Sequence, residues 1–130
     1  MKTKQMKFKS KKIEFAGLKF DSKKEFDRFQ ELLEMQEKGI ISDLHRQVKF
    51  ELLPKQKEFG ERAIIYIADH VYMYAGLLIV EDVKSKITKK QPDYIIKRKL
   101  FKYFYCNDIK KAQEMFPNLE FDRVYFKEYE

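Results

Sequence analysis

The chain contains few cysteines, glycines and prolines. Cys106 is its single cysteine, so an intramolecular disulfide is excluded and we expect a reducing compartment, the cytoplasm. With four glycines and three prolines among 130 residues, no linker divides the sequence. No apolar run approaches the ~20 residues of a membrane span, and none follows the basic N-terminus as a secretory signal requires. We therefore predict a single domain over residues 1–130, without membrane contact.

Positive charge is concentrated in two segments of a chain whose net charge is +7. Residues 1–12 contain six lysines and no acid, and we expect a flexible basic tail over residues 1–11. Residues 84–102 contain seven lysines and one arginine against Asp93 alone. Such segments attract polyanions and release counterions from a nucleic-acid backbone. The lysines expected to contact phosphate are Lys86, Lys89, Lys90, Lys97 and Lys99.

The spacing of apolar residues predicts the element order α-β-β-β-α-β. Residues 12–20 alternate and suggest a small hairpin, and Ser22 to Glu25 match a capping box that opens a helix through about Lys38. The patterns then predict three strands, a helix and a last strand, over residues 47–53, 63–74, 77–84, 93–104 and 121–126. We therefore expect an α/β (α+β) fold whose central mixed sheet is flanked by helices.

Asp69 and Asp82 fall on neighbouring strands of the predicted sheet. If Ala75-Gly76 is a two-residue hairpin loop, residue 74 pairs with residue 77, and Asp69 then lies opposite Asp82. A three-residue loop with Gly76 in the left-handed conformation would instead place Glu81 opposite Asp69.

Lys84 favours the first of these registers. Side chains alternate along a strand, so Lys84 shares the face of Asp82 while Glu81 points the other way. Like charges opposite one another are unfavourable in a sheet, and a divalent cation between them removes the repulsion. A site that needs a carboxylate and an ammonium group together therefore favours the pairing of Asp69 with Asp82.

These motifs resemble those of a known nuclease superfamily. Asp69, followed by Asp82-Val83-Lys84 at the end of an apolar strand, resembles the D…(D/E)xK signature of the PD-(D/E)XK, or restriction-endonuclease-like, nucleases. Their common core has the α-β-β-β-α-β order. Segments 20–25, 67–69, 81–84 and 97–100 look more closely like a family of small phage and prophage proteins similar to phage Holliday-junction resolvases. Ala68 stands where the nominal signature has proline, a departure that the superfamily commonly shows.

The resemblance implies a catalytic metal site. Asp69 and Asp82 would bind Mg²⁺ or Mn²⁺, because these hard cations prefer one or two carboxylates plus waters. Lys84 would orient the attacking water and stabilise transition-state charge, or accept a proton if its pKa is lowered. Glu25 would face the metal and complete its ligands, although a glutamate in a capping box can also simply bond to the backbone of Ser22.

Gln47 and Glu81 are the candidate neighbours of the metal ligands. Gln47 could contact a water on the metal or be an ordinary hydrogen-bonding residue of a strand, and Glu81 could support the ligands or face solvent. His45 and His70 lack metal-ligand spacing and are predicted to be structural or surface residues.

The expected function is that of a phage-derived, metal-dependent DNA endonuclease in the bacterial host cytoplasm. No base-reading module is evident, which favours branched DNA such as a Holliday junction over a specific sequence. Resolution of a junction would require a homodimer, an expectation that rests on analogy. The alternatives are a sequence-nonspecific phage nuclease and a non-catalytic DNA-binding module in which Asp69 and Asp82 are structural.

Overall fold

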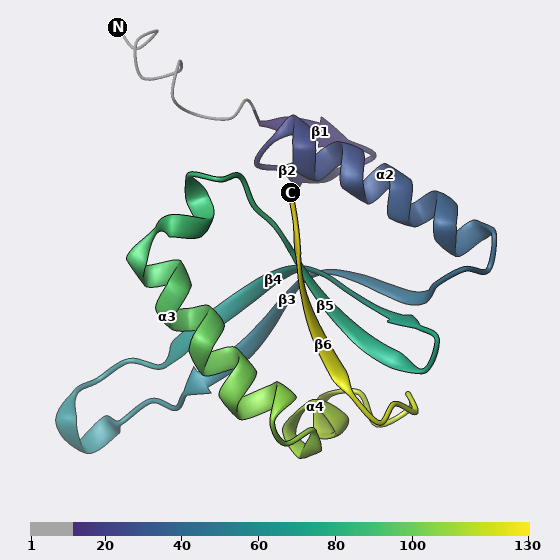
Figure 1. Ribbon diagram of the computed structural model, residues 1–130. Helices are drawn as coiled ribbons and strands as arrows, with labels where there is room; N and C mark the ends of the chain where they lie inside the picture. The colour runs from purple at the N-terminus through teal and green to yellow at the C-terminus, as the bar shows by residue number, and fades with distance from the viewer. Residues whose placement is uncertain (1–11) are drawn as a thin grey trace, which may run out of the picture.

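A mixed four-stranded sheet forms the centre of the computed structural model, which describes residues 12–130 (Figure 1). The strands lie in the order β3, β4, β5, β6, with bounds Ser42–Leu53, Ile64–Tyr74, Leu77–Val83 and Val124–Tyr129. The first three are antiparallel and β6 is parallel to β5. The predicted α+β class with a central mixed sheet is confirmed, and the predicted tail over residues 1–11 lies outside the described residues.

The N-terminal elements follow the predicted order. A hairpin of β1 (Ile13–Phe15) and β2 (Leu18–Phe20) precedes helix α2 (Lys23–Glu37). Ser22 Oγ accepts a hydrogen bond from Glu25 N at 3.1 Å, as a helix cap does. The chain turns after the helix at Gly39, whose φ of 77° only glycine adopts freely. Helix α2 packs on one face of the sheet, and its residue Leu32 is fully buried there.

The opposite face of the sheet is covered by a helical segment that begins with α3 (Pro92–Phe101). It continues as the π-helical turn η3 (Lys102–Cys106), and α4 (Lys110–Met115) follows. Phe101 and Tyr105 pack edge-on against Phe50 of β3, with ring centroids 4.9 and 5.1 Å apart. No helix within residues 12–130 is long and apolar enough to cross a membrane.

The last strand begins later than predicted. The expected bounds of 121–126 were wrong because Phe121, although buried, enters the core from the segment before β6. The helix expected over 93–104 keeps its place but changes to π-helical geometry after Phe101, and α4 had not been expected. Two 3₁₀ turns complete the described chain, η1 (Lys57–Phe59) in the β3–β4 connection and η2 (Thr88–Lys90) after β5.

The hairpin between β4 and β5 has the register that Lys84 favoured. Ala75 and Gly76 form its two-residue loop, both left-handed at φ 50° and 80°. Pairing runs from Tyr74 with Leu77 to His70 with Glu81, so the alternative register is wrong. There the β4–β5 ladder ends, whereas β5 stays paired with β6 as far as Val83. Asp69 and Asp82 are the first residues beyond the last β4–β5 pair.

Candidate functional site

Strand β3 loses its regular alternation at Gln47. The guanidinium of Arg46 lies 4.1 Å from the ring centroid of Phe20, on the side of the sheet where α2 packs. Val48 packs into the core on the α3 side, although it is only two residues away. Gln47 makes this change possible with a left-handed φ of 52°, a conformation that costs a non-glycine residue about 1–3 kcal/mol.

Strand β4 changes face at Asp69, the residue that faces Gln47 across the β3–β4 pair. Ala68 is fully buried in the α3-side core, whereas His70 stacks on Phe29 of α2 with ring centroids 6.0 Å apart. Register is kept on either side, since residue 46 pairs with His70 and residue 48 with Ala68. Gln47 and Asp69 thus lie opposite each other, and neither takes part in the regular β3–β4 pairing.

Glu25 lies at the start of α2, and its carboxylate accepts two hydrogen bonds. Its Oε1 accepts a hydrogen bond from the backbone N of Asp21 at 3.0 Å, and its Oε2 accepts one from Gln47 Nε2 at 3.1 Å. The capping box predicted a bond from Glu25 to the backbone of Ser22, and this was wrong because the bond is made with the backbone of Asp21. The side chain is 4% exposed, so the start of α2 brings a buried carboxylate to the edge of the sheet.

Asp69 connects strands β4 and β5 where their ladder has ended. Its Oδ2 accepts a hydrogen bond from the backbone N of Val83 at 2.8 Å, and its Oδ1 accepts one from Gln47 Nε2 at 3.2 Å. The amide of Gln47 therefore donates to both Glu25 and Asp69 and holds the two carboxylates together.

Asp82 is the most enclosed of the carboxylates after Glu81, at 2% exposure. The hydroxyl of Tyr66 donates a 2.8 Å hydrogen bond to Asp82 Oδ2, and Lys84 Nζ lies 3.7 Å from the same oxygen. Lys84 Nζ also lies 4.5 Å from the ring centroid of Tyr94 on α3. Lys84 thus shares the face of Asp82, as strand alternation predicted.

Crowding of these carboxylates raises two of their pKa values. Burial, followed by the neighbouring Asp69 carboxylate, raises the pKa of Glu25 to about 7. Burial and the Asp82 carboxylate raise the pKa of Asp69 to about 6, against smaller opposing hydrogen bonds from Glu25 and from the Val83 backbone. Burial and the charge of Asp82 also raise the pKa of the Tyr66 hydroxyl, so Tyr66 remains a hydrogen-bond donor.

Two cavities open on this cluster, and Lys84 lines both. The larger has a volume of about 320 Å³ and lies between the start of α2 and the turn that follows β5. Its walls include Lys24, Glu25, Asp69, Lys84, Ser85 and Thr88. The smaller has a volume of about 240 Å³ and lies between β4 and α3, with Asp82, Tyr94 and Lys97 in its walls.

The donor set fits a hard divalent cation held by one or two carboxylates. Within residues 12–130, no group of three His, Cys, Asp or Glu side chains is placed so that all three could hold one metal ion. Mg²⁺ does not require such a cage, because it usually keeps several waters. Glu25, Asp69 and Asp82 supply only oxygen ligands, and their mutual repulsion is of the kind that a cation relieves.

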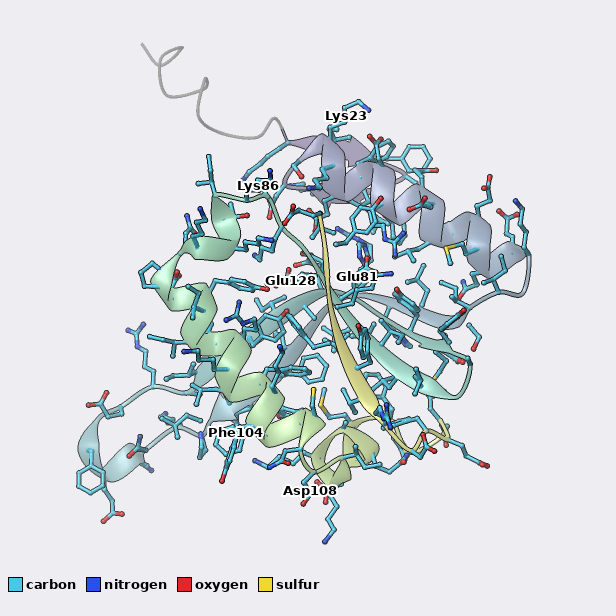
Figure 2. All side chains as sticks on the ribbon, in the orientation of Figure 1. Lys23, Glu81, Lys86, Phe104, Asp108 and Glu128 are labelled. Carbon is cyan, nitrogen blue, oxygen red and sulfur yellow. The ribbon has the colours of Figure 1, made fainter. Side chains whose placement is uncertain are left out.

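Glu81 belongs to a different group of residues on the opposite face of the sheet. Its carboxylate accepts hydrogen bonds from Arg28 Nε at 2.8 Å, Arg28 Nη2 at 2.7 Å and Tyr72 Oη at 2.7 Å. His70 Nδ1 lies 3.3 Å from Glu81 Oε2, without the alignment of a hydrogen bond. The hydrogen bonds of Glu81 go to Arg28 and Tyr72, and its side chain is fully buried, so neither predicted role, support of the ligands or exposure to solvent, is correct. Figure 2 shows Glu81 inside the molecule beside β6.

The five lysines that were expected to contact phosphate are not equivalent. Lys97 lines the smaller cavity, and Lys89 forms an ion pair with Glu130. Three of the five are exposed, namely Lys86, Lys90 and Lys99, and Figure 2 places Lys86 on the loop that leaves β5. Of the two histidines, His70 is fully buried and His45 is exposed.

Sequence reasoning missed three residues of the site. Lys24 Nζ donates a 3.0 Å hydrogen bond to the carbonyl of Lys84 and lines the larger cavity, and Tyr66 and Tyr94 contact Asp82 and Lys84. Lys24 had a usable signal, since it precedes Glu25 in the capping box. The two tyrosines had none, because they looked like ordinary apolar positions of a strand and a helix.

Comparison with protein families gives a match over residues 5–116, which is most of the chain. The family is described as "Protein of unknown function (DUF1064)". Comparisons with curated proteins and with solved structures find no match.

Proposed function

This chain belongs to the DUF1064 family, and we propose that it is a metal-dependent DNA endonuclease that hydrolyses phosphodiester bonds. One observation carries the proposal. Glu25 and Asp69 share the Gln47 amide, Asp82 lies beside Asp69 near the end of β5, and Lys84 Nζ lies 3.7 Å from Asp82. Carboxylates that raise one another's pKa beside a lysine, in a cavity open to solvent, are typical of a reaction centre.

Each residue has a distinct role in the proposed reaction. Asp69 and Asp82 would hold the cation, and Glu25 would contact a water bound to it. When bound, Mg²⁺ or Mn²⁺ supplies charge neutralisation at the phosphate and a nucleophile at neutral pH. Lys84 orients the attacking water and stabilises charge on the phosphoryl oxygens, and its position over Tyr94 keeps the ammonium group directed at Asp82. Gln47 holds Glu25 and Asp69 in place.

Lysines around the cavities support DNA as the substrate. Lys24 and Lys97 each line one of the two cavities, and exposed lysines follow β5 directly. Lysines bind phosphates as point charges and do not read bases, which favours selection of DNA by shape, as at a Holliday junction. A homodimer acting on both sides of a junction, in the cytoplasm of a bacterial host, belongs to the same proposal.

A non-catalytic DNA-binding module is the second candidate. The observation in its favour is that Asp69 already accepts two hydrogen bonds, one of which ties β4 to β5. Such an aspartate could serve the fold alone. The two candidates differ in the expected effect of Lys84→Ala, which removes an ammonium group that lies against Asp82 and Tyr94 and leaves the backbone pairing of the sheet intact.

Cleavage of a panel of branched and linear DNAs in Mg²⁺ or Mn²⁺ tests the proposal. We expect metal-dependent cutting by the wild type and loss of cutting, with much of the DNA affinity kept, in Lys84→Ala. Equal cleavage rates on a four-way junction and on linear duplex of the same sequence would remove the structure-selective claim and leave a nonspecific nuclease. Binding without cleavage in every metal would favour the non-catalytic module.

A further inference from the structure

The turn after β5 exposes an isoleucine beside the carboxylates. Ile87 is 78% exposed, more than any other large apolar residue in the described part of the chain. It lies between Ser85 and Thr88, both of which line the larger cavity together with Glu25 and Lys84. The side chain is therefore placed at the rim of the proposed reaction centre, without a core to pack against.

Hydrogen bonds hold this turn in a defined shape. Ser85 N donates to Thr88 Oγ1 at 2.8 Å, and Thr88 N donates to Ser85 Oγ at 3.1 Å. Lys89 N and Lys90 N donate to the carbonyls of Ser85 and Ile87 at 3.1 and 3.2 Å. These bonds fix the backbone on both sides of Ile87 while its β-branched side chain stays in water. Single apolar side chains are common on protein surfaces, and what distinguishes Ile87 is its place on an ordered turn at the rim of the cavity.

The charges around Ile87 indicate the kind of partner. Lys86 and Lys90 are exposed on either side of it, and Figure 2 shows Lys86 on this loop. A protein interface needs several hundred Å² of surface with an apolar centre, which one isoleucine between lysines does not provide. A nucleic acid suits the arrangement, because lysines hold its phosphates while a single apolar side chain meets its bases.

We propose that Ile87 is a wedge that enters a base step of DNA next to the phosphate held in the carboxylate cavity. The inference rests on the proposed function, since it takes DNA to be the substrate. Apolar side chains that enter a base step must unstack it, and unstacking costs free energy in continuous duplex. Where strands branch or end, the stacking is already broken. The wedge would therefore favour cleavage at branch points and explain shape selection without base reading.

The test is a fluorescence measurement of base stacking. A four-way junction and a linear duplex carry 2-aminopurine, whose fluorescence rises when it unstacks, next to the mapped cleavage position. Ca²⁺ replaces Mg²⁺ so that the DNA is bound and not cut. The variants are Ile87→Ser, the conservative Ile87→Leu, and Ile40→Ser as a matched control. Ile40 is 48% exposed and follows the far end of α2, so it is a half-exposed isoleucine remote from the cavity.

We expect the wild type, Ile87→Leu and Ile40→Ser to raise the fluorescence of bound junction. Ile87→Ser should abolish the rise and weaken junction binding roughly tenfold, as expected when one apolar side chain is no longer buried in the complex. Its junction-to-duplex ratio of cleavage rates in Mg²⁺ should fall. If Ile87→Ser matches the wild type in fluorescence while both cut DNA, the wedge is refuted and the nuclease proposal stands. If the wild type binds no DNA, both proposals fail.

Discussion

Gln47 faces Asp69 across strands β3 and β4, and its Nε2 donates a 3.2 Å hydrogen bond to Asp69 Oδ1. Both residues lie where their strands change face, and Gln47 does so with a left-handed φ of 52°. The same amide donates to Glu25 Oε2, so an irregularity of the sheet joins carboxylates from a helix and a strand. Strained residues that hold polar groups together are characteristic of functional sites.

Substitution of Gln47 separates its backbone role from its side-chain role. Gln47→Ala and Gln47→Gly both remove the amide, and we expect cleavage to fall by roughly 10- to 100-fold because the carboxylates lose their common donor. Glycine accepts the left-handed φ, so Gln47→Gly should be about 1 kcal/mol more stable to urea than Gln47→Ala. Lys49, an exposed residue in regular pairing on β3, is the control position. There Lys49→Gly should be less stable than Lys49→Ala. The same order of stability at both positions would contradict the assignment of strain to Gln47.

Divalent cations should stabilise the protein more at pH 8 than at pH 5. Glu25 and Asp69 have pKa values raised to about 7 and about 6, so their contribution to stability is present below pH ~4 and is lost as pH rises through these values. A cation binds the deprotonated carboxylates and offsets that loss. We expect the rise in Tm on adding Mg²⁺, measured by calorimetry, to grow between pH 5 and pH 8.

Asp69→Asn is the control for the metal response. It removes one charge and keeps an oxygen that can accept the hydrogen bond from Val83 N. Without metal, this variant should unfold at a higher temperature than the wild type at pH 8, and Mg²⁺ should have little effect on it. An equal response to Mg²⁺ in both proteins would show that the cation binds elsewhere.

The buried ion pair of Arg28 and Glu81 should contribute stability and leave the metal ligands in place. Glu81→Gln leaves the buried Arg28 charge with only the half-exposed Glu31 as counterion, and we expect it to cost about 3–5 kcal/mol in chemical denaturation at pH 7. Glu31→Gln removes another partner of Arg28, but that side chain is 51% exposed, so a loss below about 1 kcal/mol is expected. Equal losses of stability in Glu81→Gln and Glu31→Gln would show that burial does not increase the contribution of an ion pair to Arg28.

Acid should weaken the same ion pair. Burial opposes ionisation of Glu81, but hydrogen bonds led by those from Arg28 prevail and lower its pKa to about 2. Its contribution is therefore present above pH ~4.5 and is lost as pH falls toward 2. The wild type should lose stability over that range more steeply than Glu81→Gln, a difference that denaturation curves at pH 5 and pH 3 will measure.

Lys97 should affect DNA affinity and its salt dependence. Lys97 lines the smaller cavity beside Asp82, so Lys97→Gln should reduce the slope of log affinity against log salt by about 1. Lys110, an exposed lysine of α4, serves as the matched control and should leave the slope unchanged when replaced by glutamine. Titration of a labelled DNA at several salt concentrations gives both slopes, and equal slopes for the two variants would remove Lys97 from the DNA contact.

Local rules predicted the parts of the fold and site that depend on neighbouring residues. The capping box placed the start of α2, and the two-residue loop at Ala75 and Gly76 set the register that brings Asp69 and Asp82 to the end of one ladder. Strand alternation placed Lys84 beside Asp82. Each of these relationships needs only periodicity or turn geometry, which a sequence carries directly.

Tertiary contacts decided the rest. The left-handed Gln47 breaks the alternation from which its environment was inferred, and no local signal marks a glutamine for that conformation. Glu81 is ionised in the interior because Arg28, 53 residues earlier, lies against it. Tyr66 and Tyr94 read as core positions, but the assembled sheet brings the Tyr66 hydroxyl to Asp82, and the packing of α3 brings the Tyr94 ring to Lys84.

The rate of Mg²⁺-dependent DNA cleavage by Asp82→Asn, beside the wild type, tests the central claim most directly. Asparagine keeps an oxygen for the Tyr66 hydroxyl and removes the charge that would bind the cation. We expect metal-dependent cutting by the wild type and at least about a hundredfold slower cutting by a folded Asp82→Asn protein that still binds DNA. Cutting at the wild-type rate by that variant would contradict the assignment of the carboxylates as the metal site.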